Sequence, residues 1–169
     1  AGAILLLSVI YFFGGMTSLV ALLLAVLIHE LGHIAAIELC GGRVHGLKVS
    51  VSGLCINCSG AGGTLESVIC LCAGPAAGIA LAYAASYLGN LSQNLLLIKT
   101  AGFSLVLSVY NLLPALPLDG GRALECIARF FGGTVFAQTL LEISGMLTGA
   151  ALLFAGAYFI CLLYTSDAA

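Results

Sequence analysis

The chain has 169 residues, of which 62% are hydrophobic and only 7% are charged, with a formal net charge of -2. Ordinary soluble domains carry about 25% charged residues, so this composition cannot cover a water-facing surface and predicts a polytopic membrane protein. The 5 Lys and Arg residues form no cluster along the sequence. This excludes the basic surface that a nucleic-acid-binding protein needs.

Apolar runs divide the sequence, because a membrane-spanning helix needs about 20 mostly apolar residues. We predict five spans, at residues 1–13, 16–40, 64–88, 95–113 and within 134–163. Glycine pairs follow the first two runs, and Pro114 and Pro117 end the fourth. Glycine accepts the left-handed conformation found at helix ends, and proline cannot continue a regular helix.

Two connections between the spans carry patterns of their own. Residues 44–51 and 54–58 alternate apolar with polar or glycine positions, which predicts a short membrane-associated β-hairpin. Residues 121–131 place Glu125 and Arg129 four apart opposite an apolar side, which predicts an interfacial helix. The predicted fold is an all-α multi-pass membrane protein of about five transmembrane helices with this hairpin and helix. We expect one domain over 1–163 and a polar tail over 164–169.

The few cations predict how the chain is oriented in the bilayer. Four cations follow the second and fourth predicted spans and therefore lie on one side of the membrane. They are Arg43, Lys48, Arg122 and Arg129. Lys99 lies alone near the opposite end of the fourth span. Because Lys and Arg are enriched in cytoplasmic loops, we predict that the four-cation side faces the cytoplasm.

The second predicted span contains the sequence H-E-L-G-H at residues 29–33. Histidines at i and i+4 lie on one helical face, so His29 and His33 can bind one Zn²⁺, with Glu30 beside it as the catalytic acid/base of hydrolysis. The bland alternative is a helix whose polar residues face a wet interface. The motif begins about 11 residues from the helix end, roughly 16 Å deep, where a charge costs about 2.5 kcal/mol or more unless it is paired or metal-bound. We therefore favour metal binding.

A catalytic zinc usually has three protein ligands, so a third must come from elsewhere in the chain. Asp119 is the strongest candidate, because it follows Pro114 and Pro117 and precedes Gly120 and Gly121. The prolines end the fourth span, and the glycines permit a sharp turn that brings the carboxylate into the bundle. The alternative is that Asp119 is the N-cap of the following helix.

These motifs resemble a known family. Residues 29–33 and 111–121 resemble the two signature motifs of the site-2 protease family of intramembrane zinc metalloproteases, and residues 73–75 resemble a third family element. The layout is most similar to the sporulation-type branch of Firmicutes. The resemblance implies zinc ligation by His29, His33 and Asp119, and catalysis by Glu30. It also implies a sixth span, which we expect to be missing here, and Gly78 stands where many relatives carry asparagine.

The same resemblance extends to substrate binding and partners. It implies that Asn111 helps to hold an unwound substrate, although an amide that merely stabilises its helix is the alternative. The hairpin, with Val49 and Val51, matches a family β-element to whose edge an extended substrate can add. The expected substrate is a membrane-associated regulatory protein such as a pro-sigma factor. A membrane inhibitor protein is the expected regulator.

The predicted function is therefore intramembrane metalloendopeptidase activity at the cytoplasmic side of the bacterial cytoplasmic membrane. One alternative is a metal-binding membrane transporter or scaffold without proteolysis. Glu30 discriminates between the two, because transport needs ligands whereas hydrolysis also needs a general base beside them. A further alternative is an inactive fragment, suggested by the expected loss of the last span.

Overall fold

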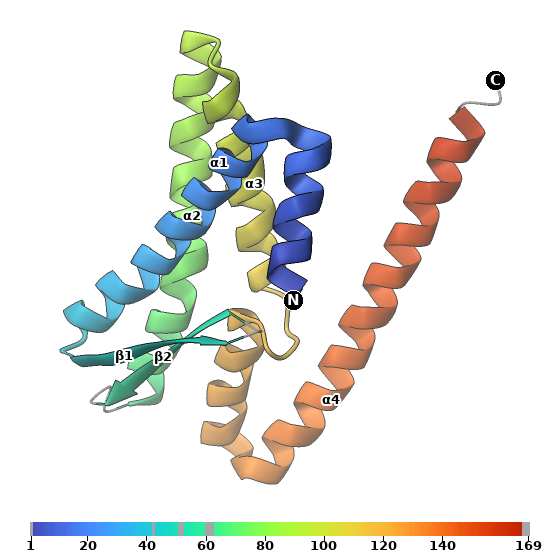
Figure 1. Cartoon of the computed structure of the whole chain (residues 1–169). Coiled ribbons are helices and arrows are strands. Elements are labelled where there is room, and N and C mark those ends of the chain that lie inside the picture. Colours follow the sequence, from blue (N-terminus) through green and yellow to red (C-terminus); the bar gives the residue numbers. More distant parts are fainter. Residues whose placement is uncertain (1, 42, 51–52, 60–62, 167–169) are drawn as a thin grey trace. The chain divides into compact units, whose positions relative to one another are not determined.

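A computed structural model describes the backbone over residues 2–41, 43–50, 53–59 and 63–166, and the side chains over 11–41 and 63–162. The elements, in chain order, are α1 (Gly2–Leu39), β1 (Arg43–Ser50), β2 (Gly53–Ser59), α2 (Thr64–Ser92), α3 (Leu95–Asn111) and α4 (Asp119–Ser166). Figure 1 shows these elements in ribbon form. The chain divides into two compact units, residues 1–112 and 113–169.

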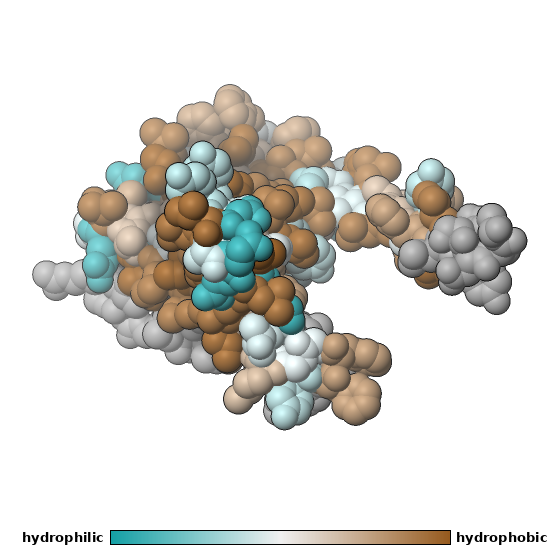
Figure 2. Space-filling model, turned by 90° about the horizontal axis from the view of Figure 1, so that it is seen from above, coloured by the Kyte–Doolittle hydropathy of each residue, from teal (hydrophilic) through white to brown (hydrophobic). Residues whose placement is uncertain are grey.

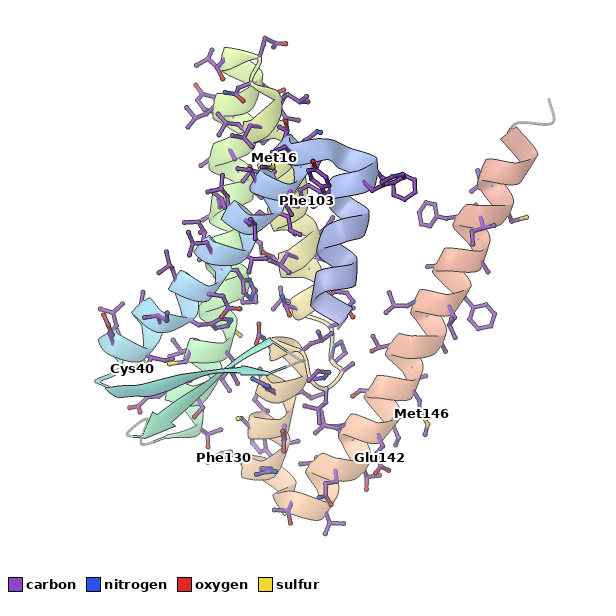
Figure 3. All side chains as sticks on the ribbon, viewed as in Figure 1. Met16, Cys40, Phe103, Phe130, Glu142 and Met146 are labelled. Atoms are coloured by element: carbon purple, nitrogen blue, oxygen red, sulfur yellow. The ribbon has the colours of Figure 1, made fainter. Side chains whose placement is uncertain are left out.

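Helix α1 consists of two segments that meet at Gly15. This residue has φ 70° and ψ -177°, a backbone conformation that interrupts the helix and that glycine adopts without a Cβ clash. The bend is visible between the darkest blue segment and the rest of α1 in Figure 1, and Met16 and Cys40 are labelled near the two ends of the second segment in Figure 3. The first two predicted spans are therefore the two segments of one bent element.

A lysine from α3 contacts the bend in α1. The Lys99 Nζ donates to the Gly14 carbonyl at 3.3 Å and to Ser18 Oγ at 2.8 Å. Ser18 Oγ itself donates to the Gly14 carbonyl at 2.7 Å. A helix interruption leaves backbone carbonyls without their usual amide donors, so these two side chains stabilise the bend where water is scarce.

Strands β1 and β2 form a two-stranded antiparallel sheet between α1 and α2. Lys48 pairs with Cys55 and Val49 with Leu54, and the register is irregular between Val44 and Leu47. Both ends of each strand lie one residue from the ranges expected from the alternation. Val51 lies outside the described residues, as do the side chains of both strands.

Helices α1, α2 and α3 pack against one another through small residues. The buried face of α2 consists of Gly74, Pro75, Gly78, Ala82, Ala85 and Gly89. The buried residues of α3 are Thr100, Ala101, Ser104 and Ser108. Small side chains let the helix backbones approach closely, which is how helices gain packing energy in a membrane that offers no hydrophobic driving force.

Helix α2 extends further than the sequence indicated. A turn was expected over residues 90–94, but α2 continues to Ser92, and Gln93 takes the left-handed position with φ 53°. Asn90 Nδ2 donates to the Ser86 carbonyl at 2.9 Å and Ser92 Oγ donates to the Leu88 carbonyl at 2.7 Å. Figure 2, seen from above, shows a hydrophilic patch within a mainly hydrophobic surface.

The second unit is built around α4, which breaks at Gly133 with φ 75° and ψ -174°. The predicted interfacial helix lies before this break and the predicted last span lies after it. Phe130 and Glu142, on either side of the break, are labelled in Figure 3. The expected pair is present, because the Arg129 guanidinium donates to the Glu125 carboxylate.

Three helices in the described part of the chain are long and apolar enough to cross a membrane, over Tyr11–Leu39, Thr64–Ser92 and Asp119–Leu162. Helix α3 is apolar but has only 17 residues, about 25 Å at 1.5 Å per residue, which is shorter than the hydrocarbon core. The predicted count of five spans is therefore not confirmed. The first two predicted runs form one bent helix, α1, and the fourth run forms α3, which stops before it reaches the bilayer thickness.

Candidate metal centre

His29 and His33 lie in the second segment of α1 and are almost entirely buried, with 3% and 8% of their surface exposed. Their rings meet edge to face with centroids 4.9 Å apart. The two Nε2 atoms are 3.2 Å from each other. The helical spacing of the motif therefore brings one nitrogen of each imidazole to a common point.

The separation of these nitrogens has a chemical meaning. Zinc binds imidazole nitrogen at about 2.0–2.1 Å, and in a tetrahedral site two such nitrogens lie about 3.3 Å apart. The observed 3.2 Å between the Nε2 atoms is close to this value. The two histidines thus have the spacing of two ligands on one tetrahedral ion.

A backbone carbonyl from α2 fixes the orientation of the second imidazole. His33 Nδ1 lies 2.8 Å from the Cys70 carbonyl oxygen. A carbonyl oxygen can only accept, so Nδ1 carries the proton and donates it. In the neutral ring this leaves Nε2 with the lone pair that a metal requires.

Close contact between α1 and α2 occurs at Gly32, the glycine of the H-E-L-G-H motif. A Cβ on Gly32 would lie 2.6 Å from Ala77 Cβ and 2.8 Å from the Ala73 carbonyl oxygen. No side chain fits at this distance, so glycine is required for the two helices to meet beside His33. Glu30, in the same turn of α1, is partly buried.

Asp119 begins α4 and belongs to the second unit. The amide of Arg122 donates to the Leu118 carbonyl at 3.0 Å, so Leu118 occupies the N-cap position and Asp119 is the first helical residue. The preceding loop folds back on this turn, because a Cβ on Gly121 would lie 2.4 Å from the Ala115 carbonyl. The alternative of Asp119 as the N-cap residue is therefore not what the local backbone shows.

The predicted ligand set combines residues of both units. His29 and His33, in the first unit, each offer a buried imidazole nitrogen. Asp119, in the second unit, offers a carboxylate oxygen, and its ligation to the same ion stays a prediction. Two imidazole nitrogens and a carboxylate oxygen match a donor set of catalytic zinc, which keeps a fourth position open. The chemistry of the residues present therefore fits zinc.

The expected substrate-binding residues are positioned less fully. Asn111 is the last residue of α3 and is partly buried. Val49 lies in β1, but its side chain is outside the described residues, and Val51 is outside them altogether. The role of all three in substrate binding stays a prediction.

Sequence reasoning missed the part that α2 plays at the site. Residues 73–75 were noted only for their family resemblance, whereas the structure places Gly74 directly against the His33 ring. The contact from Cys70 comes from its main chain. A backbone carbonyl leaves no signal in the residue type, so only the Gly-Pro pair could have drawn attention to this turn.

The fold and the site describe a helical membrane protein with a buried pair of histidines. A solved structure with this fold is that of a site-2 protease from Methanocaldococcus jannaschii, which aligns with a TM-score of 0.71. The alignment covers 95% of this chain and 78% of that chain, with 18% sequence identity. Likeness at this identity establishes the fold. The sequence matches no protein-family model and no curated protein.

Proposed function

We propose that this protein is an intramembrane zinc metalloprotease. The observation that carries the proposal is the buried pair of Nε2 atoms 3.2 Å apart on one apolar helix. Buried imidazoles are rare within membrane segments and mark functional sites there. The shared fold with a site-2 protease supports the same reading.

In this proposal His29, His33 and Asp119 hold the zinc ion. Bound zinc supplies Lewis acidity, which polarises a peptide carbonyl and makes water a stronger nucleophile. The Nδ1 hydrogen bond from His33 to the Cys70 carbonyl holds that ring in the tautomer that can bind metal. Asp119 contributes a negative charge, which offsets part of the charge of the divalent ion.

Glu30 moves the proton. Its carboxylate accepts a proton from water as the water oxygen bonds to the carbonyl carbon of the peptide. The carbon–nitrogen bond then breaks, and Glu30 returns the proton to the nitrogen of the leaving amine. The products are a carboxylic acid and an amine, which accounts for both hydrogens of the water consumed.

The substrate in this proposal is a membrane-associated regulatory protein, such as the pro-sigma factor of a sporulation-type system. Asn111 and the β1 edge, with Val49 and Val51, would hold it in extended form. The antiparallel hairpin supports this role, because strand edges offer backbone groups to an extended peptide. In this proposal cleavage takes place at the cytoplasmic face, which the distribution of cations supports. A bacterial membrane and regulation by a membrane inhibitor protein are what the sporulation-type resemblance implies.

The test is co-expression of the full chain with a panel of membrane-tethered pro-sigma factors, with cleavage followed by immunoblot and zinc by elemental analysis. Glu30→Gln should keep its zinc and lose cleavage by about 100-fold or more, because it removes the base without removing a ligand. Asp119→Asn should lower the zinc content, because a neutral amide is a weaker ligand.

The outcomes separate this function from its alternative. Equal cleavage by the parent and Glu30→Gln would reject the catalytic role of Glu30. Zinc bound by the parent without cleavage of any substrate in the panel would favour metal transport or a scaffold. An unchanged zinc content in Asp119→Asn would remove Asp119 from the ligand set.

A further inference from the structure

One turn of α2 forms a surface against which the His33 ring packs. The Cys70 carbonyl oxygen lies 2.8 Å from His33 Nδ1. One turn further along α2, a Cβ on Gly74 would lie 2.2 Å from His33 Nε2, 2.5 Å from Cε1 and 2.6 Å from Cδ2. Gly74 is buried, and Pro75 beside it is fully buried. Two backbone positions of α2 thus lie against the imidazole, the Cys70 carbonyl at its Nδ1 edge and Gly74 beside Nε2.

These contacts leave the ring little freedom. Ordinary van der Waals contact to a Cβ begins at 3.4 Å, so a side chain at position 74 would force Nε2 to move by about 1 Å or rotate the ring away. Movement of that size would change the 3.2 Å separation from His29 Nε2. It would also strain the bond from Nδ1 to Cys70. The absence of a Cβ at Gly74 is therefore a requirement of the ring position.

We infer that Gly74 is a positioning residue for the metal site, acting together with the Cys70 carbonyl. The carbonyl selects the tautomer of His33, and the glycine permits the ring orientation that points Nε2 toward His29. Outer contacts of this kind are worth about 10- to 100-fold in metal affinity. The inference rests on the proposed zinc site and adds the element of α2 that prepares it.

The chain offers a matched control one turn further along α2. Gly78 is buried on the same helix, and a Cβ there would lie 2.1 Å from Ser108 Oγ. Both glycines therefore face a steric clash of similar size when alanine replaces them. Only at Gly74 does the clash involve a histidine of the metal site, so the pair separates a positioning effect from a general packing effect.

The experiment measures zinc affinity of the purified full chain in detergent by competition with a chelator, and the absorption spectrum after loading with Co²⁺. Gly74→Ala should weaken zinc binding by about 10- to 100-fold and alter the Co²⁺ bands, which report ligand geometry. Gly78→Ala should leave both unchanged. Circular dichroism and gel filtration establish whether each variant is folded.

Three results would overturn the inference. If the parent binds zinc and Gly74→Ala binds it equally well, the inference fails while the proposed function stands. A parent that binds no zinc overturns the proposed function, and this inference with it. Nitrogen-15 NMR of the metal-free parent gives a measurement that needs no variant. Protonation of His33 at Nδ1 supports the inference, and protonation at Nε2 overturns it even if Gly74→Ala fails to fold.

Discussion

Two clusters of buried polar residues lie on the two helices that pack against α2, yet their chemistry differs. One is His29 and His33 on α1, and the other is Thr100, Ser104 and Ser108 on α3, each of the latter at most 2% exposed. Ser104 Oγ donates to the Gly78 carbonyl, Ser108 Oγ to the Ser104 carbonyl and Thr100 Oγ1 to the Leu96 carbonyl, each at 2.8 Å. The hydroxyls thus end on backbone acceptors.

The histidines differ because they bring two acceptor-capable nitrogens together. Their Nε2 atoms are 3.2 Å apart, whereas the hydroxyl of each α3 residue pairs with a carbonyl. A buried hydroxyl stabilises helix packing once its donor is used. Converging imidazole nitrogens become stable together when a cation lies between them. Burial of polar side chains in an apolar helix therefore marks a site only where ligand atoms converge.

Among the variants that test this contrast, His33→Ala should have the largest effect, and that effect is on zinc affinity. The change removes a ligand of the proposed zinc site, so zinc affinity should fall by more than the roughly 10- to 100-fold that outer contacts contribute. Ser108→Ala, which changes a buried polar residue of α3 that faces Gly78 of α2, should leave zinc affinity unchanged. Chelator competition on both purified variants measures the difference. Equal zinc affinity in the parent and His33→Ala would abolish the distinction between the two polar groups.

An intermediate effect is expected from Gly78→Ala, this time on stability. The new Cβ would lie 2.1 Å from Ser108 Oγ, and overpacking of this kind costs about 1–3 kcal/mol of unfolding free energy. Ser108→Ala removes the clashing oxygen, so the double variant should recover most of the loss. Unfolding in mixed SDS micelles measures all four proteins of the cycle. Simple additivity of the two changes would show that the close approach is not where the strain arises.

Helix boundaries were predictable where glycine or proline sets them. The bend at Gly15 and the positive φ of 74° at Gly41 coincide with the glycine pairs of the sequence, and α3 ends at Asn111, before Pro114. Proline disfavours helical conformation in the residue before it, which explains why α3 stops earlier than residue 113. The end of α2 was missed because Asn90 bonds back to its own helix.

Helix geometry made one part of the site predictable, namely the pairing of the two histidines. Spacing alone places His29 and His33 on one face, and the structure brings their nitrogens together. The hydrogen bond from His33 to Cys70 joins residues 37 apart in the chain, and no local pattern specifies which carbonyl accepts it. Likewise, two predicted segments merge into α4, and this depends on the conformation of Gly133 between them. Glycine has a wide conformational range, so the sequence does not specify that conformation.

The smallest effect is expected from Ser104→Ala, which removes the bond from α3 to the Gly78 carbonyl. Interhelical hydrogen bonds in membrane proteins average about 0.6 kcal/mol, and the helix geometry already supplies that carbonyl with an amide donor. We therefore expect a loss of about this size in mixed-micelle unfolding, with no change in zinc affinity.

Thr100→Val is the matched control for Ser104→Ala, because the Thr100 hydroxyl bonds only within α3 in the described contacts, to the Leu96 carbonyl at 2.8 Å. Valine keeps the branched shape and loses the hydroxyl. If the bond between helices is what stabilises the packing, Ser104→Ala costs more than Thr100→Val. A larger loss in Thr100→Val would mean that the hydroxyls act through their own helix, and the contrast with the histidines would then rest on the imidazoles alone.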